Sequence, residues 1–124
     1  MNSVLRLITL SVLTVFVAAK AEAMTLDELG QFCTGSGSEN STTLDPAAQF
    51  GFCLGLIQGS AYVLHSNCVL GNGTLGIGKI GQMPTNTESV SRFVAWWDNN
   101  KELGAMDASL GLFLALQTLY PCEQ

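Results

Sequence analysis

Basic residues and histidine are scarce in this chain of 124 residues. Five lysines and arginines face ten acidic residues, which gives a formal net charge of −5, and His65 is the single histidine. Binding to nucleic acids or to anionic membrane surfaces depends on clustered positive charge, so we expect neither as a partner. A basic partner protein is compatible with this charge but is not required by it.

Catalytic and cofactor motifs are scarce as well. The single histidine and the widely spaced cysteines do not form a zinc pattern, and the Gly-x-Ser-x-Gly motif is absent. Residues 71–76 match the dinucleotide-binding pattern GxGxxG, but no predicted strand precedes them and no βαβ unit fits around them. A flexible loop is the simpler interpretation. We therefore predict a protein that is not an enzyme and needs no metal or cofactor.

Residues 1–23 have the features of a cleaved signal peptide. Met1–Arg6 carries one positive charge, residues 7–19 are largely apolar, and Ala21-Glu22-Ala23 has the small-x-small pattern of a cleavage site. The apolar run is shorter than the roughly 20 residues of a membrane-spanning helix, which disfavours a retained anchor. Residues 24–124 then form one periplasmic domain with nine acidic and three basic residues, a net charge of −6.

Two helices are predicted before residue 70. Thr25 and Glu28 have the spacing of a capping box, and apolar residues at helical spacing continue to about Cys33. Asp45 is a favourable N-cap for a second helix that starts at Pro46. This helix is expected to end shortly before Cys68. Its apolar face comprises Phe50, Leu54, Ile57, Ala61 and Leu64.

Two more helices are predicted towards the C-terminus. Thr85 and Glu88 repeat the capping-box spacing at the start of a third helix. Residues 98–100, Asp-Asn-Asn, end it, because asparagine adopts the left-handed conformation of many helix exits. A fourth helix runs from about residue 106 or 107 to 120. The inward faces of these two helices comprise Val90, Phe93, Val94 and Trp97, then Leu112, Phe113, Leu116, Leu119 and Tyr120.

Glycines stand out in two places. Gly51, Gly55 and Gly59 fall every four residues along the second helix, where each costs about 1 kcal/mol relative to alanine. We favour close internal contact with another backbone as the reason, over a dimer interface. Residues 69–84 contain five further glycines and form one long Gly-rich loop.

The four cysteines, Cys33, Cys53, Cys68 and Cys122, indicate disulfides in a small exported chain, and three pairings are possible. In an up-and-down arrangement, Cys33 and Cys53 share one end of the bundle, while Cys68 and Cys122 share the other. Pairing Cys53 with Cys68 requires retracing about 18 Å of helix with residues that reach about 10 Å, which leaves more than the roughly 7 Å that a disulfide allows. We predict an all-α bundle of four main helices with Cys33–Cys53 and Cys68–Cys122 disulfides.

Several of these features resemble the Rap/Tai family of immunity proteins. Residues 52–59, Phe-Cys-Leu-Gly-Leu-Ile-Gln-Gly, are similar to the family's core motif Cys-x-Gly-Tyr-Ile-x-Gly, with Leu56 in place of the tyrosine. The family also has a cysteine at the end of an N-terminal helix, like Cys33, another after the glycine-containing helix, like Cys68, and a final Pro-Cys, like residues 121–122. The likeness covers nearly all of residues 24–124, although the loop after Cys68 is longer than the family's usual link.

The resemblance implies a periplasmic, homodimeric immunity protein of type VI secretion, which occludes the active-site cleft of a peptidoglycan amidase effector with a protruding loop. The loop of residues 98–104 is the first candidate for this contact, and residues 69–82 are the second. Two other hypotheses are a small periplasmic chaperone or stress protein that binds unfolded clients, and a scaffold part of an envelope complex. The residues assigned to the first candidate contact are Asp98, Asn99, Asn100, Lys101 and Glu102.

Overall fold

The computed structural model describes residues 22–37, 44–71 and 78–123. Its elements are α1 (Leu26–Cys33), α2 (Pro46–Val69), α3 (Asn86–Asp98), the short 3-10 helix η1 (Lys101–Leu103) and α4 (Ala108–Leu119). For this part of the chain, the prediction of a disulfide-stapled all-α bundle is confirmed. Most of the predicted signal peptide and the centre of the Gly-rich loop lie outside the described residues.

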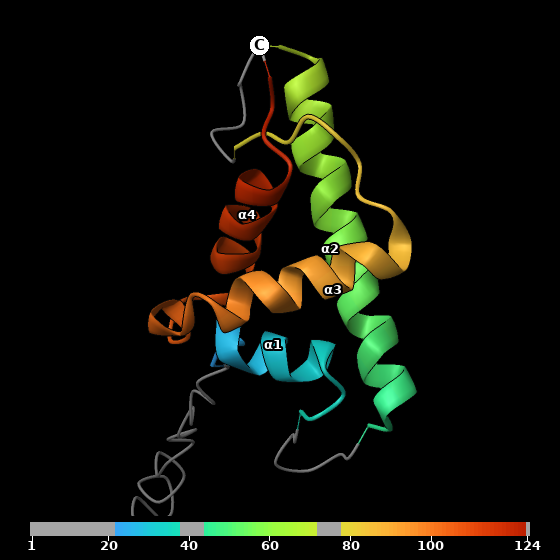
Figure 1. Cartoon of the computed structure of the whole chain (residues 1–124), viewed down its shortest axis with the longest axis vertical. Coiled ribbons are helices and arrows are strands. Elements are labelled where there is room, and N and C mark those ends of the chain that lie inside the picture. Colours follow the sequence, from blue (N-terminus) through green and yellow to red (C-terminus); the bar gives the residue numbers. More distant parts are fainter. Residues whose placement is uncertain (1–21, 38–43, 72–77, 124) are drawn as a thin grey trace, which may run out of the picture.

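The four α-helices do not form the up-and-down bundle that was assumed for the cysteine pairing. In Figure 1, α2 and α4 run along the long axis of the molecule, whereas α1 and α3 lie next to each other and run across it. Each helix contacts the other three. The crossed layout places the connection between α3 and α4 beside the start of α1.

The core lies where the four helices meet. Burying each large apolar side chain here contributes about 1.5–3 kcal/mol relative to leaving it exposed. Phe50 was predicted to lie on the apolar face of α2, but it lies near the start of this helix and is 36 % exposed. The fully buried apolar side chains are Leu26, Leu29, Cys53, Ile57, Ala61, Leu64, Ile80, Phe93, Leu112, Ala115 and Leu116.

The helix starts follow the predicted caps with one exception. At α1 the amide of Thr25 donates to Glu28 Oε2 at 2.7 Å and the amide of Glu28 to Thr25 Oγ1 at 3.3 Å, a complete capping box. Asp45 caps α2 through its side chain. Thr85 is the N-cap of α3, but the predicted second capping box is wrong, because its hydroxyl donates to the Glu88 carboxylate and accepts no backbone hydrogen bond.

Both predicted disulfides are present. The Cα atoms are 5.2 Å apart in Cys33–Cys53 and 6.0 Å apart in Cys68–Cys122. The expected end of α2 was wrong, because the helix continues to Val69 and carries Cys68 in its last turn. Cys53 and Cys68 therefore lie on one continuous helix, about 22 Å apart along its axis. This separation alone excludes a Cys53–Cys68 disulfide, without an argument from the reach of a loop.

Helix α2 is long and apolar enough to cross a membrane by length and composition, a test that core helices of globular proteins also pass. Its buried side has polar residues that anchor neighbouring loops. The Gln49 amide donates to the carbonyls of Leu44 and Gly37 at 2.8 and 2.9 Å, and the Asn67 amide donates to the Gly78 carbonyl at 2.6 Å. These contacts attach one side of α2 to the rest of the described fold, while 28 % of its apolar window is buried.

The glycine stripe of α2 faces outward, which contradicts the predicted internal contact. A Cβ added at Gly51, Gly55 or Gly59 would meet nothing within 4 Å among the described residues. The glycines belong to a solvent-facing strip of α2, which we call the α2 outward face. It comprises Ala48, Gly51, Phe52, Gly55, Gly59, Tyr62, Val63 and Val69.

Candidate functional site

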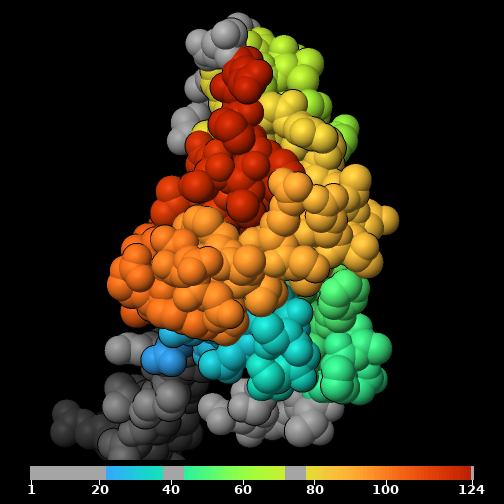
Figure 2. Space-filling model, viewed as in Figure 1, coloured from blue at the N-terminus to red at the C-terminus, as the bar shows by residue number. Residues whose placement is uncertain are grey.

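The connection between α3 and α4 projects from one side of the molecule. This α3–α4 loop, residues 99–107, extends beyond α1 and α4 on the left in Figure 1 and forms the left edge of the face in Figure 2. It contains four of the five residues predicted for partner contact, and Asp98 ends α3 directly before it. The structure thus brings the five predicted residues together on one projecting segment.

The α3–α4 loop is braced by the chain at the start of α1. The amides of Leu26 and Asp27 donate to the carbonyls of Met106 and Gly104 at 2.8 and 3.0 Å. A third backbone hydrogen bond, 2.9 Å long, runs from the first residue of α4 to the Met24 carbonyl. Segments about 80 residues apart in the sequence are joined in this way, so the backbone of the loop is held in place before any partner arrives.

Trp97, Asp27 and two glycines form the inner side of this brace. The indole Nε1 of Trp97 donates to Asp27 Oδ1 at 2.8 Å. A Cβ on Gly30 would overlap the Trp97 ring, and a Cβ on Gly104 would overlap the Asp27 carboxylate. Neither Asp27 nor these glycines have a sequence pattern that marks them as part of the site, since only their proximity in the fold identifies them.

The side chains of Asn99 and Asn100 bind the end of α3. Their side-chain amides donate to the carbonyls of Ala95 and Trp96 at 2.8 and 2.6 Å. Their φ angles are −86° and −132°, so the predicted left-handed exit is wrong. The helix ends where these side chains bind carbonyls of its last turn, so both side-chain amides are engaged by α3.

Lys101 and Glu102 are exposed on η1 and differ in their surroundings. Lys101 Nζ lies 3.1 Å from Asp98 Oδ1 and 2.8 Å from the centroid of the Trp97 ring, so its charge is engaged on two sides. Glu102 forms no ion pair with any described residue. Among the five predicted residues, Glu102 is therefore the charged group most available to a partner.

Negative charge predominates around the loop. The α3–α4 loop and the residue before it contain three carboxylates, Asp98, Glu102 and Asp107, and one cation, Lys101. Asp107 caps α4, and hydrogen bonds from the Ser109 side chain and then from backbone amides of the first turn lower the pKa of its carboxyl group. The projecting surface is therefore acidic at neutral pH.

The second predicted contact, residues 69–82, is described only at its two ends. Val69 is exposed, whereas Ile80 is fully buried and its amide donates to the Leu64 carbonyl at 3.2 Å. Ile80 also forms an isolated antiparallel bridge with Pro121. The exit of this loop is therefore part of the core, and residues 72–77 lie outside the described structure.

The described residues contain no group of three or more histidine, cysteine, aspartate or glutamate side chains placed to hold a metal ion. His65 has a buried Nδ1 atom without a hydrogen-bond partner among them. Comparisons of the chain with protein-family models, curated proteins and solved structures gave no match. The likeness to the Rap/Tai family rests on the motif residues of the sequence.

Proposed function

We propose that this chain is a periplasmic immunity protein that binds a peptidoglycan amidase effector of type VI secretion and covers its active-site cleft with the α3–α4 loop. The observation that carries the proposal is the bracing of this projecting loop by two backbone hydrogen bonds from the start of α1, with a third between the first residue of α4 and Met24. A segment that is ordered before binding loses little conformational entropy when it enters a cleft. The resemblance to Rap/Tai proteins suggests the class of target.

The disulfides support the compartment in this proposal. Both bonds are present, and the described residues contain no free cysteine. Disulfides persist in oxidising compartments such as the periplasm and are rare in the cytosol of most organisms. Together with the predicted signal peptide of residues 1–23, they favour a site of action outside the inner membrane, where cell-wall amidases act.

The charge of the loop suggests the complementary surface. Glu102 is exposed and unpaired among the described residues, and Asp98 and Asp107 flank the same loop in the sequence. Complementary charges raise association rates and favour the correct partner. We therefore expect basic groups around the amidase cleft and an affinity that falls as salt concentration rises.

A charge reversal with a matched control tests the loop. The amidase is identified by pull-down from the native periplasm with mass spectrometry, and its affinity for each variant is then measured. We expect Glu102→Lys to weaken binding by about tenfold or more, while Glu123→Lys, at another exposed glutamate in the segment after α4, leaves it unchanged. The proposal is wrong if no amidase is captured and the protein gives no protection to cells making a periplasmic amidase.

We also propose that two copies of the chain associate through the α2 outward face. Helix α2 has no aspartate, glutamate, lysine or arginine over its 24 positions, so the face avoids the repulsion between two acidic proteins. Its exposed residues follow the order large, small, small, large at Phe52, Gly55, Gly59 and Tyr62. An antiparallel pair of these helices would place Phe52 opposite Tyr62 and the two glycines opposite each other, which is the self-complementarity that a twofold interface needs.

Sedimentation equilibrium tests this association. We expect the wild type to dimerise at about 100 µM and Tyr62→Glu to be monomeric. Leu110→Glu, on an exposed apolar residue of α4, is the control and should still dimerise. A monomeric wild type contradicts the proposed dimer. If the monomeric protein also suppresses aggregation of unfolded proteins, the chaperone hypothesis replaces the immunity role.

A further inference from the structure

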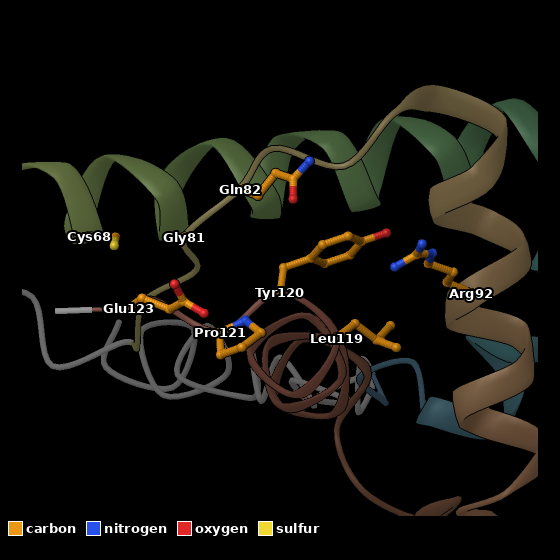
Figure 3. Close-up of a pocket in the computed structure, with 8 residues that line it drawn as sticks. All are labelled: Cys68, Gly81, Gln82, Arg92, Leu119, Tyr120, Pro121 and Glu123. Atoms are coloured by element: carbon orange, nitrogen blue, oxygen red, sulfur yellow. The ribbon is translucent and has the colours of Figure 1, made fainter.

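A cleft of about 370 Å³ lies between α3, the end of α4 and the chain before α3. None of its lining residues belongs to the α3–α4 loop, and one of them, Cys68 (Figure 3), is disulfide-bonded to Cys122. Sites for small ligands begin at about this volume. The lining residues are Cys68, Gly81, Gln82, Arg92, Leu119, Tyr120, Pro121 and Glu123.

The walls of the cleft are fixed by the fold. The Gly81 amide donates to the Tyr120 carbonyl at 3.0 Å, and Ile80 pairs with Pro121 in an antiparallel bridge. A Cβ on Gly81 would overlap the Pro121 carbonyl oxygen, so the two segments are in direct contact. Since the disulfide of Cys122 also ties this segment to α2, a ligand would meet a preformed surface and pay little ordering cost.

One end of the cleft is rich in hydrogen-bond donors. The Arg92 guanidinium carbon lies 5.6 Å from the centroid of the Tyr120 ring, and Figure 3 shows the Tyr120 hydroxyl pointing towards Arg92. The Tyr120 hydroxyl is protonated at neutral pH, as tyrosine ordinarily is, and burial raises its pKa further. Glu88 Oε1 contacts Arg92 Nη2 at 2.6 Å, but a guanidinium has five N–H donors and this one is about half exposed.

The other end of the cleft has the opposite charge. Glu123 lies there, away from Arg92, with the Tyr120 ring and Pro121 between them (Figure 3). Arginine binds carboxylates through charge-assisted hydrogen bonds, and a glutamate carboxylate does the same for an ammonium group. The floor between them is apolar, formed by Leu119, Pro121 and the aromatic ring.

We propose that this cleft binds a short peptide that carries a free C-terminal carboxylate and a free amine. The carboxylate lies at Arg92 and the Tyr120 hydroxyl, and the amine lies towards Glu123. Small aliphatic side chains rest on the apolar floor. The site does not depend on the proposed immunity role, because none of its lining residues belongs to the α3–α4 loop.

The probe is L-alanyl-L-alanine, compared with its C-terminal amide and its N-acetyl form, and NMR titration of the folded, disulfide-bonded protein is the readout. We expect the free dipeptide to shift the amide signals of Gly81, Gln82 and Tyr120 with a dissociation constant below about 10 mM. Each blocked form should bind at least about tenfold more weakly. The proposal is overturned if the dipeptide causes no shifts at these residues, or if the amide binds as well as the free acid.

Two variants of α3 should act in opposite directions. Arg92→Gln removes the carboxylate partner and should weaken binding at least about tenfold, whereas Glu88→Gln frees the guanidinium and should strengthen binding about threefold or more. Lys101→Gln removes a cation far from the cleft and should change nothing. Arg92 and Glu88 are both about half exposed, so folding is retained, and unchanged affinity in Arg92→Gln would overturn the assignment.

Discussion

Alanine at Gly55 and at Gly30 should change stability in opposite directions. Gly55 lies on the α2 outward face, where an added Cβ meets nothing within 4 Å. The variant gains the helix propensity of alanine without a clash, so we expect the free energy of unfolding to rise by about 1 kcal/mol. For a domain of this size the melting temperature should increase by about 4–8 °C.

At Gly30 the same methyl group would overlap the indole ring of Trp97. Displacing a buried ring costs about 1–3 kcal/mol, and losing the hydrogen bond from Trp97 to the Asp27 carboxylate costs about 1.5–3 kcal/mol. After subtraction of the gain in helix propensity, about 1 kcal/mol, Gly30→Ala should be about 1.5–5 kcal/mol less stable than the wild type.

Urea denaturation with the disulfides intact measures both effects. Protein at about 1 µM keeps a weak dimer dissociated, so that the stability of the single chain is compared. Gly59→Ala, in the same exposed stripe, serves as a second test of the outward orientation. A loss of stability in Gly55→Ala would mean that α2 is covered within one chain, and a gain in Gly30→Ala would refute the packing of Trp97 on α1.

Replacing Cys33 and Cys53 together by serine opens a closure of 20 residues, which by loop entropy should cost about 3 kcal/mol. Replacing Cys68 and Cys122 opens one of 54 residues and should cost about 4 kcal/mol; urea midpoints in the reverse order would contradict this reasoning. Because the pKa of Asp107 is lowered in the folded protein, its ionised carboxylate stabilises the fold at pH values above the ordinary carboxyl pKa. This stabilisation is lost as the pH falls through the lowered pKa. Asp107→Asn should therefore flatten the decline of melting temperature below about pH 4, and an unchanged decline would show that this cap does not contribute.

Local signals predicted most of the helices. The caps at Thr25 and Asp45 depend on residues within one turn, so the sequence contains all that is needed to recognise them. Thr85 shows the limit of such a signal, because its spacing to Glu88 also permits a contact between the two side chains, which is the one that forms. The cysteine pairing was predicted correctly even though two helices cross the others, because each pair lies at one end of α2.

Long-range features could not be predicted in the same way. The contact of Trp97 with Asp27 joins residues 70 positions apart and leaves no periodic trace in the sequence. The glycine stripe of α2 has the same spacing whether it meets another helix of the chain or faces outward, so the pattern did not determine its orientation. The five predicted loop residues do lie together, but the brace behind them became visible only in the fold.

The two disulfides make the covalent structure a closed network as well as a linear chain. One disulfide closes a loop of residues 33–53 and the other closes a loop of residues 68–122. The two closed loops are joined to each other only by residues 53–68 of α2. A protease cut anywhere in residues 34–52 or 69–121 leaves both fragments attached to each other, whereas a cut inside residues 53–68 separates them. That vulnerable stretch is helical along its whole length, so nicked protein should keep its full mass until a reducing agent is added.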